Sequence, residues 1–228
     1  MISNKNIEFD DLFYKVATNN FSLEYLKKVE LFYPKFSGSD NFNEIKYKCE
    51  NLLSAIYFMN TMDEKSLQID LDLLQSSSPY LNDYSVILRA IKTSEELGRT
   101  MEVVPYANFF LEDKHDNWSC KLPLLFWYTK VNPNGESGSF SAFELLLSSI
   151  EERMGVKVDN SLSFVDRVEY LYKEFRRGSE DLHHFKVAYA KAPAEQKDTL
   201  LSDYLTTEKV GFYRDQVIKT YQKKNSIF

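Results

Sequence analysis

An all-α fold is predicted by three features of this 228-residue sequence. Apolar residues recur at helical spacing, as in Ile45, Cys49, Leu52 and Ile56, which lie along one core-facing stripe. Only seven Gly and six Pro are present, too few for the many turns of a β-sandwich. Apolar residues make up 43 % of the chain and aromatic residues 15 %, which is enough for a folded core and excludes a disordered chain. The sequence therefore predicts a multi-helix array or bundle.

Helical periodicity predicts eleven helices along the chain. Their ranges are 6–18, 21–33, 41–62, 80–97, 100–112, 120–130, 139–154, 162–177, 179–191, 194–206 and 208–224. Pro79 is placed to begin one of them, and Gly98 and Gly155 are each placed to end one in the left-handed conformation. Gly178 is expected to separate two helices, with Ser179 as the cap of the second.

One segment departs from helical spacing. Leu67, Ile69, Leu71 and Leu73 alternate with polar residues, which is the period of a strand, although the composition is that of a helix. A helix or loop is the prediction for this segment, and a minor short strand pair with residues 156–158 is the alternative.

The domain organisation is predicted from a turn and from the charge. Residues 132–135 read Asn-Pro-Asn-Gly, the order that a tight turn prefers, so a boundary is expected between an acidic helical part, 1–131, and a second helical part, 139–228. One compact domain over 1–228 is the alternative. Residues 1–150 hold 14 Lys+Arg against 21 Asp+Glu, and residues 151–228 hold 14 against 13. Acidic character is therefore concentrated in the first part.

Several classes of protein are disfavoured by what the sequence lacks. No apolar run reaches the about 18 residues of a membrane span, and the first residues do not have the pattern of a signal peptide. Cys49 and Cys120 stand far apart without a CxxC spacing, which indicates reduced thiols and a cytoplasmic protein. No phosphate-binding glycine loop, nucleophile elbow or calcium loop is present, so no cofactor is expected.

The one stretch that could carry chemistry is EFRRGSEDLHHF, residues 174–185. It holds Arg176, Arg177, His183 and His184. An arginine can bind a phosphate with its planar, permanently charged guanidinium, and a histidine can transfer a proton near neutral pH. Together these residue types suit RNA cleavage without a metal. The other interpretation is that the stretch is only a junction between two helices.

The spacing in this stretch resembles the motif of HEPN-domain ribonucleases, which is an arginine, four to six residues, and a histidine. Five residues separate Arg177 from His183, and six separate Arg176 from His183 and Arg177 from His184. The resemblance covers at most residues 139–228. It implies that Arg176, Arg177, His183 and His184 are catalytic, that RNA is the substrate, and that the protein is a homodimer.

A second candidate is residues 112–120, where Asp113, His115, Asp116 and Cys120 have the side chains of metal ligands. Neither zinc-finger spacing nor a second His/Cys cluster accompanies them, so a solvated loop with Trp118 turned to the core is predicted, and no metal. The many Tyr and Phe residues could stack on bases, but at helical spacing in an acidic chain they are expected to pack between helices.

By elimination, the predicted function is a non-enzymatic helical module that binds another protein through a groove or face of the acidic first part. An adaptor, an inhibitor or an immunity-type protein that neutralises a basic partner belongs to this class. The alternative is a HEPN-like, metal-independent endoribonuclease of a toxin or phage-defence type.

Overall fold

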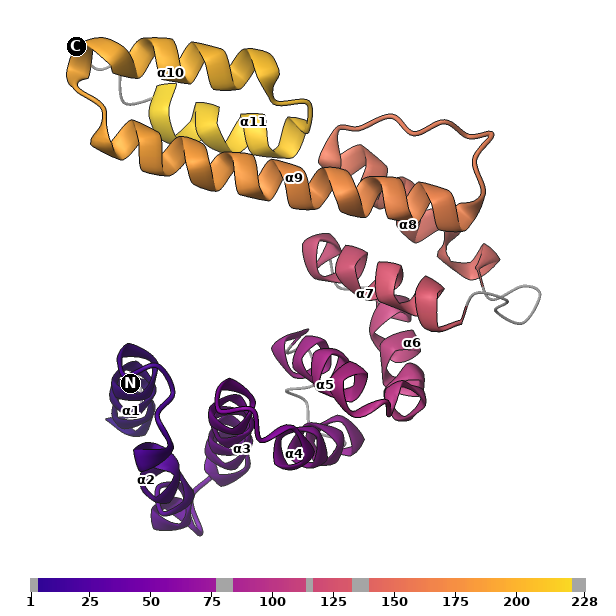
Figure 1. Ribbon diagram of the computed structural model, residues 1–228. Helices are drawn as coiled ribbons and strands as arrows, with labels where there is room; N and C mark the ends of the chain where they lie inside the picture. The colour runs from indigo at the N-terminus through magenta and orange to yellow at the C-terminus, as the bar shows by residue number, and fades with distance from the viewer. Residues whose placement is uncertain (1–3, 77–83, 114–116, 133–139, 223–228) are drawn as a thin grey trace. The chain divides into compact units, whose positions relative to one another are not determined.

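The structure is a computed structural model that describes residues 4–76, 84–113, 117–132 and 140–222. These ranges hold eleven α-helices and no β-strand, so the predicted all-α fold is confirmed (Figure 1). The chain divides into two compact units, residues 1–110 and 111–228, here called unit 1 and unit 2. Most of the loop expected at 131–139 lies outside the described residues, and a domain boundary in that loop stays a prediction.

Unit 1 is a succession of helices in which each packs on its neighbours. Its elements are α1 (Asn4–Thr18), η1 (Leu23–Tyr25), α2 (Leu26–Glu30), η2 (Tyr33–Phe36), α3 (Phe42–Met59), α4 (Asp63–Gln75), α5 (Tyr84–Leu97), η3 (Thr100–Glu102) and most of α6 (Val104–Glu112). The η elements here are short 3₁₀ turns. Phe9, Val16, Val29, Ile45 and Ile56 belong to the apolar core shared by α1, α2 and α3.

The single helix expected at 21–33 is wrong. Asn20 and Phe21 have φ angles of 53° and 54°, in the left-handed region that ends rather than begins a helix. Pro34 lies at the start of η2 and has no N–H to continue a helical ladder. The segment is therefore split into two 3₁₀ turns with the five-residue α2 between them.

The alternating segment at 67–73, for which a helix or a loop was predicted, is helical within α4, and the alternative of a strand pair is wrong for these residues. Its buried side chains are Ser66, Leu67, Asp70, Leu73 and Leu74. These positions have helical spacing, but a serine and an aspartate occupy two of them. The polar residues in the core face are the reason that apolar periodicity alone suggested a strand.

A buried ion pair explains the aspartate. Asp70 is 0 % exposed, and its Oδ1 lies 2.6 Å from Nη2 of Arg89 on α5. Arg89 also donates to Asn51 and Ser54 of α3, at 2.8 and 2.9 Å. A buried charge needs a partner and hydrogen bonds to be tolerated, and this network supplies both while joining α3, α4 and α5.

Unit 2 is organised by one long helix. Its elements are α7 (Trp118–Val131), η4 (Ser141–Phe143), α8 (Glu144–Met154), α9 (Phe164–Lys191), α10 (Ala194–Thr207), α11 (Gly211–Val217) and the π-helical turn η5 (Ile218–Gln222). In Figure 1, α8 lies along the first half of α9, and α10 and α11 lie along its second half.

The predicted glycine ends are confirmed by φ angles of 66° at Gly98 and 65° at Gly155.

The predicted break at Gly178 is wrong, because α9 runs through it from Phe164 to Lys191. Gly178 is buried, and a Cβ atom there would lie 2.5 Å from Cδ2 of Tyr213. Gly178 thus makes room for a neighbouring ring, and Ser179 is not a helix cap. The cap of α9 is Ser163, whose Oγ accepts a hydrogen bond from the N–H of Asp166 at 3.2 Å.

None of the helices in the described part of the chain combines the length and apolarity needed to span a bilayer.

Candidate functional site

The continuous α9 arranges the two arginines and two histidines as two parallel pairs. Residues seven apart return to nearly the same side of a helix, roughly 10 Å along its axis. Arg176 therefore shares one side of α9 with His183, and Arg177 shares another with His184. The rings of His183 and His184 lie 6.0 Å apart. Both histidine side chains are exposed.

The side with Arg176 faces solvent. Its side chain is 62 % exposed, and Nη2 lies 3.5 Å from Oε1 of Glu180, one turn along. Such exposed pairs contribute little to stability.

The side with Arg177 faces the other helices of unit 2. Arg177 contacts three carboxylates: Glu174 at 3.1 Å, Asp181 at 2.5 Å and Glu208 at 2.9 Å. Partial burial by itself lowers the pKa of Arg177, but Glu208 and Glu174 outweigh it and raise the pKa above its ordinary value. All five N–H donors of a guanidinium lie on its edge, so a phosphate would compete with these carboxylates for the same donors.

Glu208 is the most deeply buried of these carboxylates. It ends α10, and its side chain is 1 % exposed. Oε1 accepts from Arg177 and from the N–H of Val210, at 2.9 and 2.7 Å. Its other oxygen, Oε2, is buried and has no hydrogen-bond partner among the described residues; the same is true of the Tyr204 hydroxyl. Burial, then the charges of Glu208 and Asp181, raise the pKa of Tyr204.

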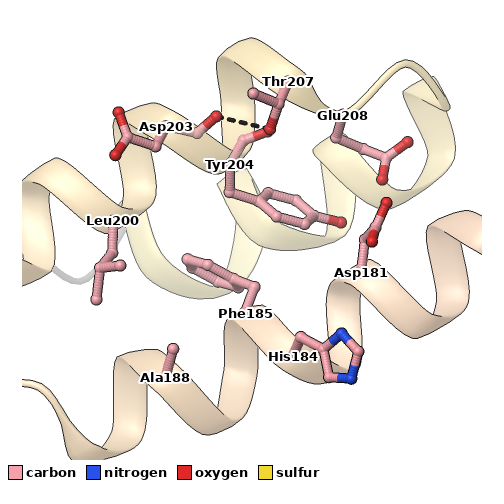
Figure 2. A pocket seen from close by; sticks show the side chains of 9 residues that line it. All are labelled: Asp181, His184, Phe185, Ala188, Leu200, Asp203, Tyr204, Thr207 and Glu208. Atoms are coloured by element: carbon pink, nitrogen blue, oxygen red, sulfur yellow. Dashed lines mark hydrogen bonds between the residues drawn. The ribbon is translucent and has the colours of Figure 1, made fainter.

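These groups meet in a pocket of about 500 Å³ between α9 and α10, here called the α9–α10 pocket. Asp181, His184 and Phe185 line it from α9; Asp203, Tyr204 and Glu208 line it from α10 and its end. Figure 2 shows the carboxylates of Asp181 and Glu208 on the same side of the pocket as the Tyr204 hydroxyl. Of the four residues named by the HEPN resemblance, the pocket includes only His184.

The structure describes only part of the candidate metal-binding stretch at 112–120. His115 and Asp116 lie outside the described residues, while Cys120 is half-buried and the carbonyl of Asp113 accepts a hydrogen bond from Lys121. In the ranges that the structure covers, no group of three or more His, Cys, Asp or Glu side chains is placed to hold a metal ion. Trp118 packs edge-on against Phe212 and Phe175, with ring centres 4.8 and 5.7 Å away, as expected for a core-facing side chain.

A second hollow lies in unit 1 and is here called the α1–α3–α5 groove. Its volume is about 280 Å³. Its apolar lining consists of Phe9, Phe13, Phe21, Leu52 and Ala55, and its polar lining of Lys48, Asn51, Ser85 and Arg89. Phe13 lies 6.5 Å from the Phe9 ring and is 46 % exposed. Both cations are paired, Lys48 with Glu44 at 2.6 Å and Arg89 with Asp70.

The fold and these two hollows define the class: an all-α, multi-helix protein with an acidic pocket in one unit and an apolar groove in the other. No protein-family model matches the chain, and comparison with curated proteins and with solved structures finds no match.

The sequence analysis missed the groups that make both hollows. Glu208 and Tyr204 are far from the RRGSEDLHH window in sequence, and a lone Glu at a helix end carries no signal of burial. Phe9 and Phe13 are four residues apart, which is the spacing of an ordinary core stripe on a helix. Only the packing shows that Phe9 is buried and Phe13 is half-exposed.

Proposed function

We propose that the protein is a non-enzymatic helical module that binds another protein through the α1–α3–α5 groove. The observation that carries this proposal is Phe13, a large apolar side chain left 46 % exposed at the edge of an apolar hollow. Protein interfaces are centred on anchor side chains that fill such hollows. We include a cytoplasmic location in this proposal. It is supported by the two cysteines, which are both free thiols.

The size of the groove favours a protein side chain over a small molecule. Its volume of about 280 Å³ is at the lower limit of the about 300–1,000 Å³ of typical ligand pockets. One helix of a partner could place one or two anchors there, at the i and i+4 spacing used in helix-in-groove recognition.

The charge of unit 1 favours a basic partner. Residues 1–110 hold 11 Lys+Arg against 16 Asp+Glu, a net charge of −5. Asp10 and Asp11 are exposed on α1, beside the groove-lining Phe9 and Phe13. The partner segment that fits is therefore an amphipathic helix with bulky apolar anchors and Lys or Arg on its flanks.

A display selection tests this function without a known partner. A library of helical peptides is selected on the full-length protein, and each enriched peptide is measured against Phe13→Glu and Tyr14→Glu. Tyr14 is the matched control, since it is the neighbouring exposed aromatic on α1 but does not line the groove. We expect peptides with apolar anchors and basic flanks that lose about thirtyfold or more in affinity with Phe13→Glu, the scale of a hot spot, and keep it with Tyr14→Glu. Peptides that bind both variants equally, or no enrichment, would contradict the proposal.

The second candidate function is a HEPN-like endoribonuclease. What favours it is the matched placement of Arg176 with His183 and of Arg177 with His184 on the continuous α9, with both histidines exposed. The three carboxylates around Arg177 weigh against it, because they compete with a phosphate and repel it.

An RNA cleavage assay separates the two functions. The protein and its His183→Ala/His184→Ala variant are incubated with labelled mixed RNA in chelator. The protein-binding function predicts no difference between them. Cleavage by the parent protein alone would make the arginine and histidine pairs an active site.

A further inference from the structure

We propose that the α9–α10 pocket binds a primary alkylammonium group, either of a free amine or of a lysine side chain. This binding site belongs to unit 2 and does not depend on the groove proposed in unit 1.

The acidic side of the pocket has more negative charge than its arginine neutralises. Asp181, Glu208 and the adjoining Glu174 share the single guanidinium of Arg177. Three carboxylates against one cation leave an excess of negative charge in a partly desolvated site, where a further cation is attracted more strongly than in water.

Two buried polar atoms on this side lack a partner. Oε2 of Glu208 and the hydroxyl of Tyr204 are both buried, belong to residues that line the pocket, and make no hydrogen bond to any described residue. Buried polar groups in proteins are nearly always hydrogen-bonded, because an unpaired one costs free energy. Oε2 can only accept, so the matching group must be a donor. The Tyr204 hydroxyl can accept as well.

The opposite side of the pocket is mostly apolar, although the Asp203 carboxylate lies beside Leu200 there. In Figure 2, Leu200 and Ala188 lie at one end and Asp181 and Glu208 at the other, with the rings of Phe185 and Tyr204 between them. A ligand that follows this gradient has an alkyl stem for the apolar end and a cationic head for the acidic end. A primary ammonium supplies three N–H donors at the end of such a stem, and the aromatic rings add attraction for the cation.

Inorganic cations fit less well. No three-residue His, Cys, Asp or Glu group in the described ranges has the geometry to hold a metal ion, and that includes the carboxylates of this pocket. The side chains of Leu200 and Ala188 offer no ligand to a metal, whereas they match the stem of an amine.

The test is a titration of the full-length protein followed by ¹H–¹⁵N NMR. The probes are Nα-acetyl-lysine methylamide and 1,4-diaminobutane, and the control probe is the same lysine derivative acetylated on Nε, which lacks the charge. We expect saturable shifts confined to α9, α10 and α11 with the amines and none with the acetylated control. Tighter binding of the lysine derivative would indicate a partner's lysine as the source, and tighter binding of the diamine a free amine.

Two variants with a matched control locate the site. Asp181→Asn removes one charge from the acidic end and should weaken amine binding by about tenfold or more, the scale of a charge-assisted hydrogen bond. Glu180→Gln is the control: it also removes a carboxylate paired with an arginine, but it lies on the Arg176 side of α9 and should leave binding unchanged.

Tyr204→Phe removes only the unpaired hydroxyl. It should weaken amine binding while leaving the thermal midpoint of the free protein unchanged or higher, because no hydrogen bond is lost. The proposal is overturned by the absence of saturable shifts, by equal shifts with the acetylated control, by equal effects of Asp181→Asn and Glu180→Gln, or by a lower midpoint for Tyr204→Phe.

Discussion

The ring of Tyr213 packs directly on the backbone of α9 at Gly178. A Cβ atom at residue 178 would lie 2.5 Å from Cδ2 and 2.6 Å from Cε2 of that ring. The Tyr213 hydroxyl also donates to the carbonyl of Phe175 at 3.0 Å, and Tyr213 is nearly fully buried. This contact holds α11 against α9 at the point from which Arg177 reaches Glu208.

Gly178→Ala should therefore destabilise the protein, although alanine is the better helix former. Crowding in a packed site costs about 1–3 kcal/mol, more than the about 1 kcal/mol gained in helix propensity. Urea unfolding measures the change. In a Tyr213→Ala background the same substitution has space, and we expect it to be neutral or stabilising. A loss of equal size in both backgrounds would contradict the contact.

Asp70→Ala should be one of the most damaging single changes in unit 1. It leaves the guanidinium of Arg89, only 9 % exposed, without its carboxylate, and breaking a buried pair costs about 3–5 kcal/mol. Asp72→Ala, an exposed aspartate on the same helix, should change the free energy of unfolding by no more than about 0.5 kcal/mol. If Asp70→Ala lowers the free energy of unfolding in urea as little as Asp72→Ala does, the network does not stabilise the fold.

Cys49 should resist alkylation while the protein is folded. Burial, with a smaller effect from Glu50, raises the pKa of its thiol to about 12, so almost no thiolate forms near pH 8. Treatment with iodoacetamide at pH 8 followed by mass spectrometry should find Cys49 modified only when urea is present. Rapid labelling of the native protein at this residue would mean that α3 opens or that the thiol is accessible.

Alkaline pH should destabilise unit 2. Burial raises the pKa of Tyr213 to about 12 from an ordinary value of 10, so the folded state favours the neutral phenol. The corresponding contribution to stability is complete below pH 10 and is lost as the pH rises through 12. We expect the urea midpoint to fall across this window.

The Tyr213→Phe variant is the control for the alkaline loss. It should be less stable at pH 8, since the hydrogen bond to Phe175 is lost, but it should lose less between pH 10 and 12. An unchanged pH dependence in this variant would assign the alkaline loss to other groups of unit 2, such as Tyr204, whose pKa is also raised by burial.

Local features of the chain could be read from the sequence alone. The all-α class, the ends at Gly98 and Gly155, and the apolar stripe of α3 follow from periodicity and backbone preference, which depend on residues close together in the chain. The window with Arg176, Arg177, His183 and His184 was also visible, because its residue types and spacing are local.

The tertiary structure alone decided which polar and small residues are buried. Gly178 resembles a helix end until the Tyr213 ring is seen against it, and Asp70 breaks the apolar period until Arg89 is seen beside it. Glu208 and Tyr204 join Asp181 in one pocket only because α10 folds back on α9. The physical reason is the same in each case: the environment that makes these residues favourable is supplied by partners distant in sequence, and no local pattern encodes it.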